Sequence, residues 1–460
     1  MTYAKMLLSS VLSTLVLVGC ADVAVTEPLA LPATPAAYRH AAPAGAPVTA
    51  PALWWNAFAD ARLDQLEDRA MARNTSLQAA AARLARARAL VRQAGAAQWP
   101  QLGLGASTAR AGGGFYRAQG EAGDLHQLRL DASFEVDVMG RLSKASQAAR
   151  LDAQAAQALL ADARLLVQAD VAQAYFSLRA IDAERTVVRD TVGAYRETLQ
   201  LIERRRAAGD VGDLDVARVR TEVAATEAQA LALDRRRQEL ETALAVLVGD
   251  LPGDLGIAEG LWPETLPTVP AGLPSSLLAR RPDVVAAQAS YRAAQARLGV
   301  AQTAWFPSIS LTAAAGGASP ELADLFKGSA GFWGLNALLS LPVFDGGRRE
   351  AGVESAAAQA DEVAAAYRER VLLAFKDVED QLANLALLDA QGQAQAEAVG
   401  SAQRALALSN IRYRNGLVSQ LELLDSRRTE LANRRQALQV RAAQYQATVA
   451  LIKALGGSWS

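Results

Sequence analysis

The sequence has very few of the residues on which most enzyme and metal sites depend. Its 460 residues include one cysteine, Cys20, and two histidines, His40 and His126. Neither a nucleophile–base pair nor a Cys/His metal cluster can be proposed from so few groups. We therefore expect no enzyme activity, no metal site and no cofactor. A net charge of −1 also gives no electrostatic reason to expect a nucleic-acid partner.

The N-terminus has the features of a targeting segment. Lys5 precedes an apolar run, Met6–Val18, which is too short to span a bilayer comfortably. Leu17-Val18-Gly19-Cys20 follows and resembles the lipobox of bacterial lipoproteins. We predict a signal peptide over residues 1–19, a lipid (diacylglycerol and N-acyl) on Cys20, and a Pro/Ala-rich tether over residues 20–52. The alternative is an ordinary signal peptide with a chance cysteine.

An internal duplication organises the rest of the chain. Residue types recur 207 positions apart over roughly 150 residues, and a repeat of this kind should be identified before any fold is predicted. The recurring pairs include Pro100 and Pro307, Gly140 and Gly347, Gly209 and Gly416, and Gly249 and Gly456. We predict two copies of one unit, over residues 53–249 and 276–457, joined by a Pro/Gly-rich linker, 250–275.

Each copy is expected to contain helices, two strands, a long helix, a glycine turn and a returning helix. In the first long helix, apolar residues recur every seven positions at Leu160, Val167 and Ala174, which is typical of helices packed as coiled coils. The predicted ranges in the first copy are helices 61–98, strands 100–139, long helix 140–208 and helix 213–248. Those in the second are helix 283–304, strands 306–345, long helix 347–414 and helix 419–455.

The strands have one apolar and one polar face. Leu128, Leu130 and Ala132 alternate with Arg129 and Asp131, which is the period of a strand. Such strands can cross a bilayer, but four of them cannot close into a barrel, because the smallest single-chain barrels have about eight. Unpaired edges cannot lie in lipid, so we expect the strands of several chains to form one sheet. Three chains would supply about 12 strands and two about 8. A soluble α/β protein with long helical spacers is the alternative.

Eight segments together resemble one family. They are Trp54-Trp55, Gly140-Arg-Leu142, Leu278–Val284, Phe306–Leu311, Leu341–Arg348, Arg412–Gly416, Leu421–Ser426 and Lys453–Gly457. The chain resembles the TolC-type outer-membrane efflux proteins, in particular the lipoprotein branch of the outer-membrane factors of resistance-nodulation-division (RND) pumps. The family's order of motifs covers nearly the whole mature chain.

This resemblance implies a mainly α protein with a β-barrel, in the outer membrane of a Gram-negative bacterium. It implies a homotrimer with a 12-stranded transmembrane barrel and a long α-helical coiled-coil barrel in the periplasm. The protein would be the passive exit duct of a tripartite pump, with a periplasmic adaptor and an inner-membrane RND pump as partners. A channel for type I protein secretion is the main alternative, and a non-conducting envelope lipoprotein is a further one.

The family's pattern places function at the two glycine turns. The predicted adaptor-docking residues are Gly209, Asp210, Val211, Asp215, Gly416, Leu417 and Val418. The predicted pore gate is Asp425, Glu422 and Leu421. Glu422 and Asp425 are three residues apart and share one helix face, so three-fold symmetry would give rings of carboxylates that favour cations. The alternative is that they are solvated acids favoured by the helix dipole.

Three further interpretations concern single positions. The resemblance also implies that an acid at the position of Asp215, with Asp210 and Asp213 near it, could hold the closed state through a base on the second turn. This chain has Val418 and Ser419 there, with only Arg412 and Arg414 nearby, so a role of Asp213 and Asp215 at the helix dipole is favoured. Pro282 and Asp283 are expected to start a helix. Four aromatic residues at strand ends could form membrane-interface belts or be buried at strand–helix junctions. They are Trp305, Phe306, Trp333 and Phe344.

Overall fold

The computed structural model describes residues 31–40, 53–111, 123–260, 262, 266–270 and 274–458. The predicted lipidation site, Cys20, and the predicted signal peptide lie outside the described residues. The chain divides into two compact units. Arg86–Ala155 and Ala287–Arg368 belong to one, here the sheet unit, and Pro32–Ala85, Ala156–Ala286 and Glu369–Ser460 form the other, here the hairpin unit. Each unit draws on both copies, so the sequence repeats are not the compact units.

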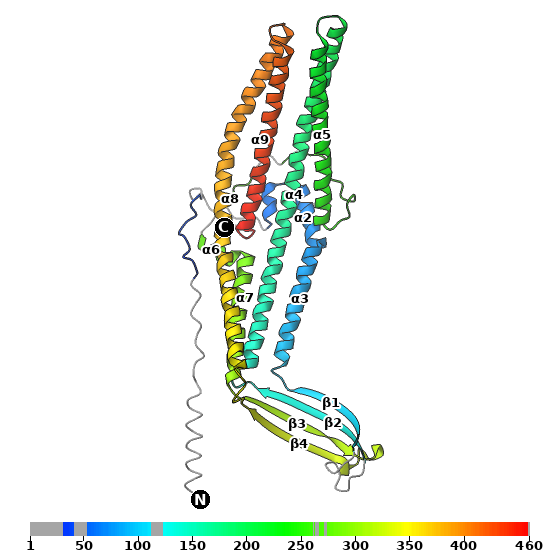
Figure 1. Ribbon diagram of the computed structural model, residues 1–460, viewed down its shortest axis with the longest axis vertical. Coiled ribbons are helices and arrows are strands. Elements are labelled where there is room, and N and C mark those ends of the chain that lie inside the picture. The colour runs from blue at the N-terminus through cyan, green and yellow to red at the C-terminus, as the bar shows by residue number, and fades with distance from the viewer. Residues whose placement is uncertain are drawn as a thin grey trace. The chain divides into compact units, whose positions relative to one another are not determined.

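The sheet unit contains one antiparallel sheet of four strands in the order β1-β2-β3-β4 (Figure 1). Its strands are β1 (Gln101–Ala111), β2 (Gly123–Val136), β3 (Ser308–Ser319) and β4 (Gly331–Ser340). Each predicted strand region therefore contains two strands. The prediction that β4 continues to residue 345 is wrong, because Pro342 has no N–H for the ladder and Gly346 and Gly347 adopt positive φ.

The strand register collects apolar side chains on one face of the sheet. Leu104 lies opposite Leu130, Leu130 opposite Ala315, and Ala315 opposite Trp333. The next row of this face, two residues along each strand, contains Leu102, Ala132, Ala313 and Leu335. Within the described chain Leu104 is 75% exposed and Trp333 78%. The predicted two-faced strands are confirmed, and no described residue covers their apolar face.

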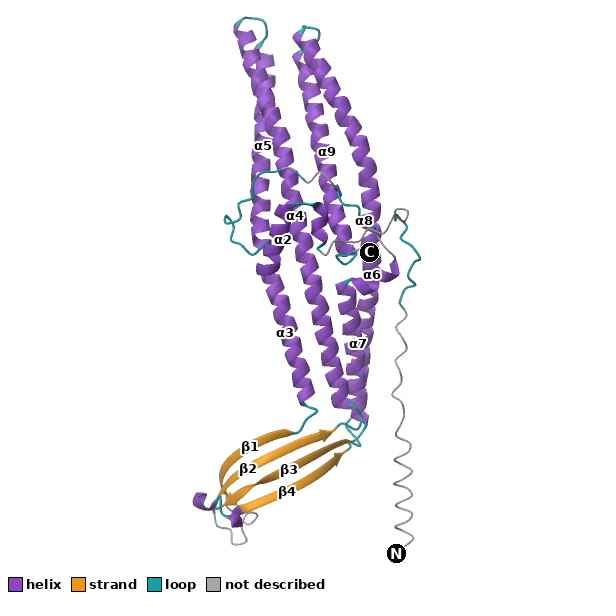
Figure 2. Ribbon diagram, turned by 180° about the vertical axis from the view of Figure 1, so that it is seen from behind, coloured by secondary structure: helices purple, strands orange, loops and turns teal. Residues whose placement is uncertain are grey.

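Eight α-helices are described (Figure 2). They are α2 (Ala61–Arg73), α3 (Thr75–Ala96), α4 (Arg141–Ala207), α5 (Asp213–Leu247), α6 (Pro274–Arg280), α7 (Pro282–Gln302), α8 (Arg348–Arg414) and α9 (Gln420–Ala454). The expected helices are present with shifted ends, and α6 was not predicted. Among the described residues, none of these helices combines the length and the apolar composition needed to cross a membrane.

The core of the hairpin unit combines segments from both copies. Trp54, Trp55 and Phe58 are buried, and the Phe58 ring lies 4.8 Å from Phe176 of α4 and 6.2 Å from Tyr445 of α9, measured between centroids. Only 5% of the residues in the sequence are aromatic, so this core contains a large fraction of the aromatic side chains of the protein. Trp54-Trp55 therefore belongs to the packed core.

The aromatic residues near the strand ends are not buried within the chain. Trp305 is 49% exposed, Trp333 78% and Phe344 90%. The Arg349 guanidinium lies 4.7 Å from the Trp305 ring centroid. The interpretation of these three as buried junction residues is wrong, whereas Phe306 is half-buried.

Candidate functional site at the helix turns

The hairpin unit contains two helical hairpins that lie side by side (Figure 1). We call α4 and α5 the first hairpin, and α8 and α9 the second. In the first, Asp210 N donates to Arg205 O at 2.9 Å, and in the second, Leu417 N donates to Arg412 O at 2.9 Å. These bonds define a Schellman turn at each end.

Both turns depend on a left-handed glycine. Gly209 has φ +82° and Gly416 has φ +71°, a region in which a side chain is strained. After the second turn, Ser419 Oγ accepts from Glu422 N at 3.4 Å. The predicted glycine turns are confirmed, and Ser419 is the N-cap of α9.

The acids of the first turn pair within their own hairpin. Asp213 lies 2.5 Å from Arg206, and Asp215 lies 3.7 Å from Arg218. In the described part of the chain, neither acid pairs with the second turn. Near the turns, a polar contact between the hairpins is instead made by Arg205 at the end of α4, whose Nη1 donates to the hydroxyl of Tyr413 at the end of α8 at 3.3 Å. Tyr413 lies in the Arg412–Gly416 motif, but no local sequence pattern assigns it this partner.

The three predicted gate residues are exposed at the start of α9. Glu422 lies 3.9 Å from Arg412, and both side chains are at least half exposed. Asp425 has no hydrogen bond or ion pair within the described residues, and Leu421 is 47% exposed. The neighbouring Leu423 and Leu424 are buried. One helix face thus offers two carboxylates and a leucine to solvent or to another chain.

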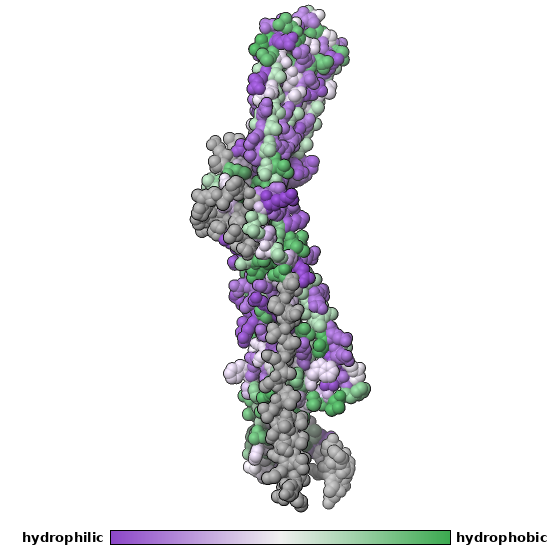
Figure 3. Space-filling view, turned by 90° about the vertical axis from the view of Figure 1, so that its left-hand side faces the viewer, coloured by the Kyte–Doolittle hydropathy of each residue, from purple (hydrophilic) through white to green (hydrophobic). Residues whose placement is uncertain are grey.

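The predicted docking residues lie on the turns themselves. Asp210 and Leu417 are exposed, whereas Val211 and Val418 are half-buried. Leu417 is 67% exposed, and Leu214 beside the first turn is 62% exposed. Figure 3 shows hydrophobic side chains among hydrophilic ones on the surface at this end of the helices. The turns therefore present isolated apolar side chains in a polar surround.

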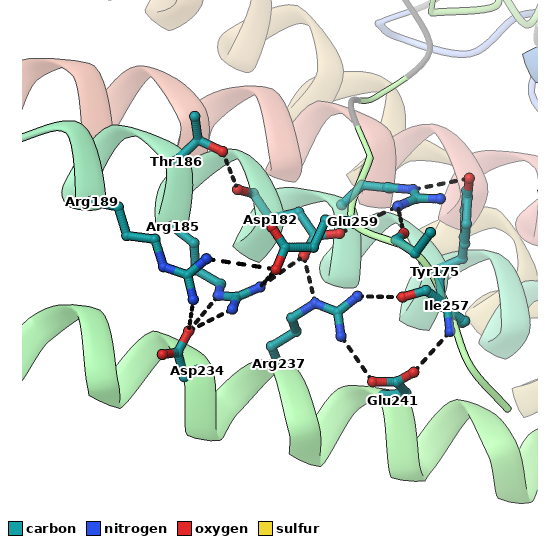
Figure 4. A network of polar contacts seen from close by, with 12 residues as sticks. Tyr175, Asp182, Arg185, Thr186, Arg189, Asp234, Arg237, Glu241, Ile257 and Glu259 are labelled. Atoms are coloured by element: carbon teal, nitrogen blue, oxygen red, sulfur yellow. Dashed lines mark hydrogen bonds and ion pairs between the residues drawn. The ribbon is translucent and has the colours of Figure 1, made fainter. Parts of the chain in front are cut away.

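A buried charge network holds the linker against the first hairpin (Figure 4). Asp182, which is 3% exposed, accepts from Arg237 of α5 at 2.7 Å and lies 3.5 Å from Arg185. Arg237 Nη2 also donates to Ile257 O at 2.6 Å, and Arg179 Nη1 donates to Ala258 O at 2.8 Å. The linker predicted at 250–275 is thus bound along residues 257–259. Sequence spacing shows that Asp182 and Arg185 are neighbours on one helix but not that α5 and the linker complete the network.

The second copy has a buried arginine at the base of its hairpin. Arg281 is 8% exposed and donates to both oxygens of Asp283, at 3.0 and 2.8 Å. It also donates to Asp377 at 3.0 Å and to Ala454 O at 3.3 Å. Pro282 begins α7 as predicted. Asp283, expected to act on the helix dipole, is also the bidentate partner of Arg281.

Comparison with known proteins agrees with this architecture. The model of the family "outer membrane efflux protein" matches residues 66–250 and 273–457. The two matched ranges begin 207 residues apart and end 207 residues apart, which is the offset of the duplication.

Named relatives are similar over most of their length. The pyoverdine export outer membrane protein OpmQ of Pseudomonas aeruginosa is 34% identical over 440 residues, which cover 93% of this chain and 92% of that protein. The cation efflux system protein CusC of Escherichia coli O6:H1 is 31% identical over 410 residues, 88% of each.

Solved structures show the same fold. The outer-membrane channel OprN matches with a TM-score of 0.89 and 28% identity, over 95% of this chain and 99% of that one. The outer membrane protein VceC of Vibrio cholerae matches with a TM-score of 0.83 and 30% identity, over 88% and 98%. The predicted mainly helical, duplicated channel fold and the predicted efflux function are therefore confirmed. The chain belongs to the outer membrane efflux protein family.

Proposed function

We propose that this protein is a homotrimeric, passive exit duct of a tripartite efflux pump. The observation that carries the proposal is the four-stranded sheet, whose apolar face is exposed and whose edge strands, β1 and β4, have no partner strand among the described residues. Edges must be paired in lipid, so β4 of one chain would pair with β1 of the next. Three chains would close a barrel of about 12 strands.

The anchor of the duct would be the lipid on Cys20. A diacylglycerol and an N-acyl chain supply several acyl chains, and each buried CH₂ contributes about 0.8 kcal/mol to membrane binding. The position of the single cysteine directly after Leu17-Val18-Gly19 supports this modification. The protein would sit in the outer membrane of a Gram-negative bacterium, with its hairpins in the periplasm.

The exported compounds would be small molecules delivered by an inner-membrane RND pump through a periplasmic adaptor. Relatives are named for pyoverdine, for cations and for toluene, so the family serves chemically unrelated compounds. The adaptor would dock on the turns, where Leu417 is exposed beside polar residues. No feature of the described residues favours protein secretion over small-molecule export.

Closure of the duct would depend on the start of α9. Asp425 is exposed and unpaired within the described chain, so a three-fold axis would bring three of these carboxylates together. Glu422 would form a second ring, weakened by Arg412 nearby, and Leu421 an apolar one. Like charges held together disfavour the passage of anions.

Conductance of the purified, acylated protein in planar bilayers tests the gate. We expect small, cation-preferring openings in the wild type, and larger or less selective openings in Asp425→Ala. The matched control is Glu397→Ala, which removes an exposed acid from α8 of the same hairpin and should leave the conductance unchanged. Stable pores unaffected by Asp425→Ala would exclude Asp425 as the gate. A monomeric, non-conducting protein would contradict the duct itself and favour an envelope lipoprotein.

A further inference from the structure

The second hairpin packs on the first through one face of α9, here called the seam, which contains polar as well as apolar residues. Leu424 and Leu431 are buried, the former against Val216 and Val219 of α5 and the latter in a cluster with Ile181 and Val188 of α4. On the same face, at the spacing of a heptad, lie Gln420, four residues before Leu424, and Arg427, four residues before Leu431. Polar residues and leucines therefore alternate along this seam in the first turns of α9.

Polar atoms in this seam are buried without partners, although Arg427 as a whole is half-buried. Gln420 is 8% exposed, and neither its Oε1 nor its Nε2 has a hydrogen-bond partner among the described residues. The same holds for Arg427 Nη1 and for the hydroxyl of Tyr195, a fully buried residue of α4. The Arg427 guanidinium lies 5.9 Å from the Tyr195 ring centroid. Four unpaired polar atoms thus lie close to the turns.

The directions of two pKa shifts agree with this unfavourable environment. Burial lowers the pKa of Arg427, because desolvation of the charged guanidinium outweighs the opposing effect of Tyr195, Glu197 and Glu430. Burial also raises the pKa of Tyr195 to about 12. In both residues, desolvation is the largest cause of the pKa shift.

The duplication explains how Arg427 lost its partner. Its equivalent in the first hairpin is Arg220, which pairs with Glu203 of α4 at 2.7 Å on the exposed surface. The position equivalent to Glu203 in the second hairpin is Asn410. Arg427 therefore keeps its charge but makes no ion pair with an acid among the described residues, although Glu430 of its own hairpin acts on it electrostatically, and its side chain lies over Tyr195 of the other hairpin.

We propose that Gln420 and Arg427 are positioning residues of the gate, which lower the free energy needed to separate the second hairpin from the first near the turns. When the seam opens, water hydrates the four unpaired atoms, and this gain offsets part of the lost Leu424 packing. Residues beside the seam, including Asp425, would then move with the second hairpin. The inference rests on the proposed function, because separation of the hairpins matters only if it opens a duct.

Reactivity of a buried thiol measures this separation without any need for a pore. Leu424→Cys places a thiol at a site that is 1% exposed in the seam, and its maleimide labelling rate in the purified full-length protein reports the open fraction. The single natural cysteine is Cys20, and mass spectrometry of the peptide that contains position 424 separates the introduced thiol from the natural one. The rate is compared in four further backgrounds, Gln420→Leu, Arg427→Met, Arg427→Lys and Arg220→Met.

We expect Gln420→Leu and Arg427→Met each to slow labelling about tenfold, because each removes unpaired buried atoms from the closed seam. Arg427→Lys retains the charge and should label at nearly the wild-type rate, which a mere change in packing would not produce. Arg220→Met, the equivalent change on the exposed surface of the first hairpin, should have no effect. Unchanged or faster labelling in both Gln420→Leu and Arg427→Met would overturn the inference. A non-conducting wild type with the expected labelling pattern would instead contradict the proposed duct alone.

Discussion

The interiors of the two hairpins differ although their sequences come from one duplicated unit. In the first hairpin, Ile202 of α4 and Val219 of α5 are fully buried in one apolar cluster. The equivalent residues of the second hairpin are Ser409 and Ser426, whose hydroxyls lie 2.9 Å apart. Duplication has thus kept the backbone of the hairpin while the forces that hold its two helices together have changed.

The apolar interior of the first hairpin should be more stabilising than the polar interior of the second. Burying an isoleucine or a valine contributes about 1.5–3 kcal/mol, whereas a buried hydrogen bond contributes about 0.5–1.5 kcal/mol net. One turn further along, the buried Val223 of the first hairpin is matched by Glu430 in the second, which lies 3.4 Å from Arg434. The second hairpin is therefore the one whose helices should separate more readily near the turns.

At their bases the two copies make the same contact with different chemistry. Asn74 Nδ2 donates to Leu247 O at 2.8 Å, and at the equivalent positions Arg281 Nη1 donates to Ala454 O at 3.3 Å. Asn74 also caps α3, since its Oδ1 accepts from Leu77 N at 3.1 Å. A neutral amide thus holds the first copy, and a charged group holds the second.

A large effect is expected at this base. Arg281→Ala leaves the half-buried Asp283 without its bidentate partner and with only Arg370 at 3.8 Å, so we expect a loss of about 3 kcal/mol in unfolding free energy. Asn74→Ala removes neutral hydrogen bonds and should cost about 1–3 kcal/mol. Chemical unfolding in detergent, followed by far-ultraviolet circular dichroism, measures both. Equal losses would mean that the charge of Arg281 adds nothing to the contact that Asn74 already makes.

A second prediction concerns the hairpin interiors. Ile202→Ala opens a cavity in the apolar cluster and should cost about 2–5 kcal/mol, whereas Ser409→Ala should cost about 1 kcal/mol. Hydrogen exchange of the α4–α5 and α8–α9 peptides near the turns reports each local change. We also expect faster exchange in the second hairpin of the wild type. Faster exchange in the first hairpin would reverse the comparison.

Much of this architecture could be predicted from local signals. The turns at Gly209 and Gly416 follow from glycine conformation, and the two-faced strands follow from alternation along one segment. The break between α2 and α3, within the predicted helical range 61–98, occupies only Asn74, and a single capping residue gives a weaker signal than proline. The short helix α6 begins at Pro274, at the end of a segment whose Pro/Gly content indicated a linker.

The site was only partly predictable, because local signals in the sequence do not specify contacts between distant segments. Glu422 and Asp425 share a face because of helix geometry, which a sequence contains. The burial of Gln420 depends on packing between hairpins about two hundred residues apart, and no local pattern distinguishes it from an exposed glutamine. Likewise, the spacing of three residues predicts that Asp182 can pair with Arg185. Its other partner, Arg237, lies on another helix and cannot be predicted from spacing.

The comparison of the copies extends to a titratable group, where the expected effect is a change in how stability depends on pH. Glu67 of α2 is fully buried, and its equivalent in the second copy is Pro274, at the start of the shorter helix α6. Burial, with Asp68 and Asp64 nearby, raises the pKa of Glu67 to about 9. Both carboxyl oxygens lack a hydrogen-bond partner among the described residues. The folded protein therefore holds a proton that the unfolded chain releases above its ordinary pKa of 4.5.

The sign of the pH dependence follows from this proton. Since the folded pKa lies above the unfolded one, the contribution of Glu67 is most favourable below pH 4.5 and is lost as the pH rises towards 9, with a slope of at most about 1.4 kcal/mol per pH unit. Glu67→Gln cannot release a proton, so its unfolding free energy should fall less steeply across this range. Asp68→Asn, which changes a neighbouring exposed acid, should retain most of the wild-type slope. Identical slopes in Glu67→Gln and the wild type would show that Glu67 is ionised in the folded protein. The first copy would then contain an ionised, paired carboxylate at Glu67 in place of a buried, protonated carboxyl group.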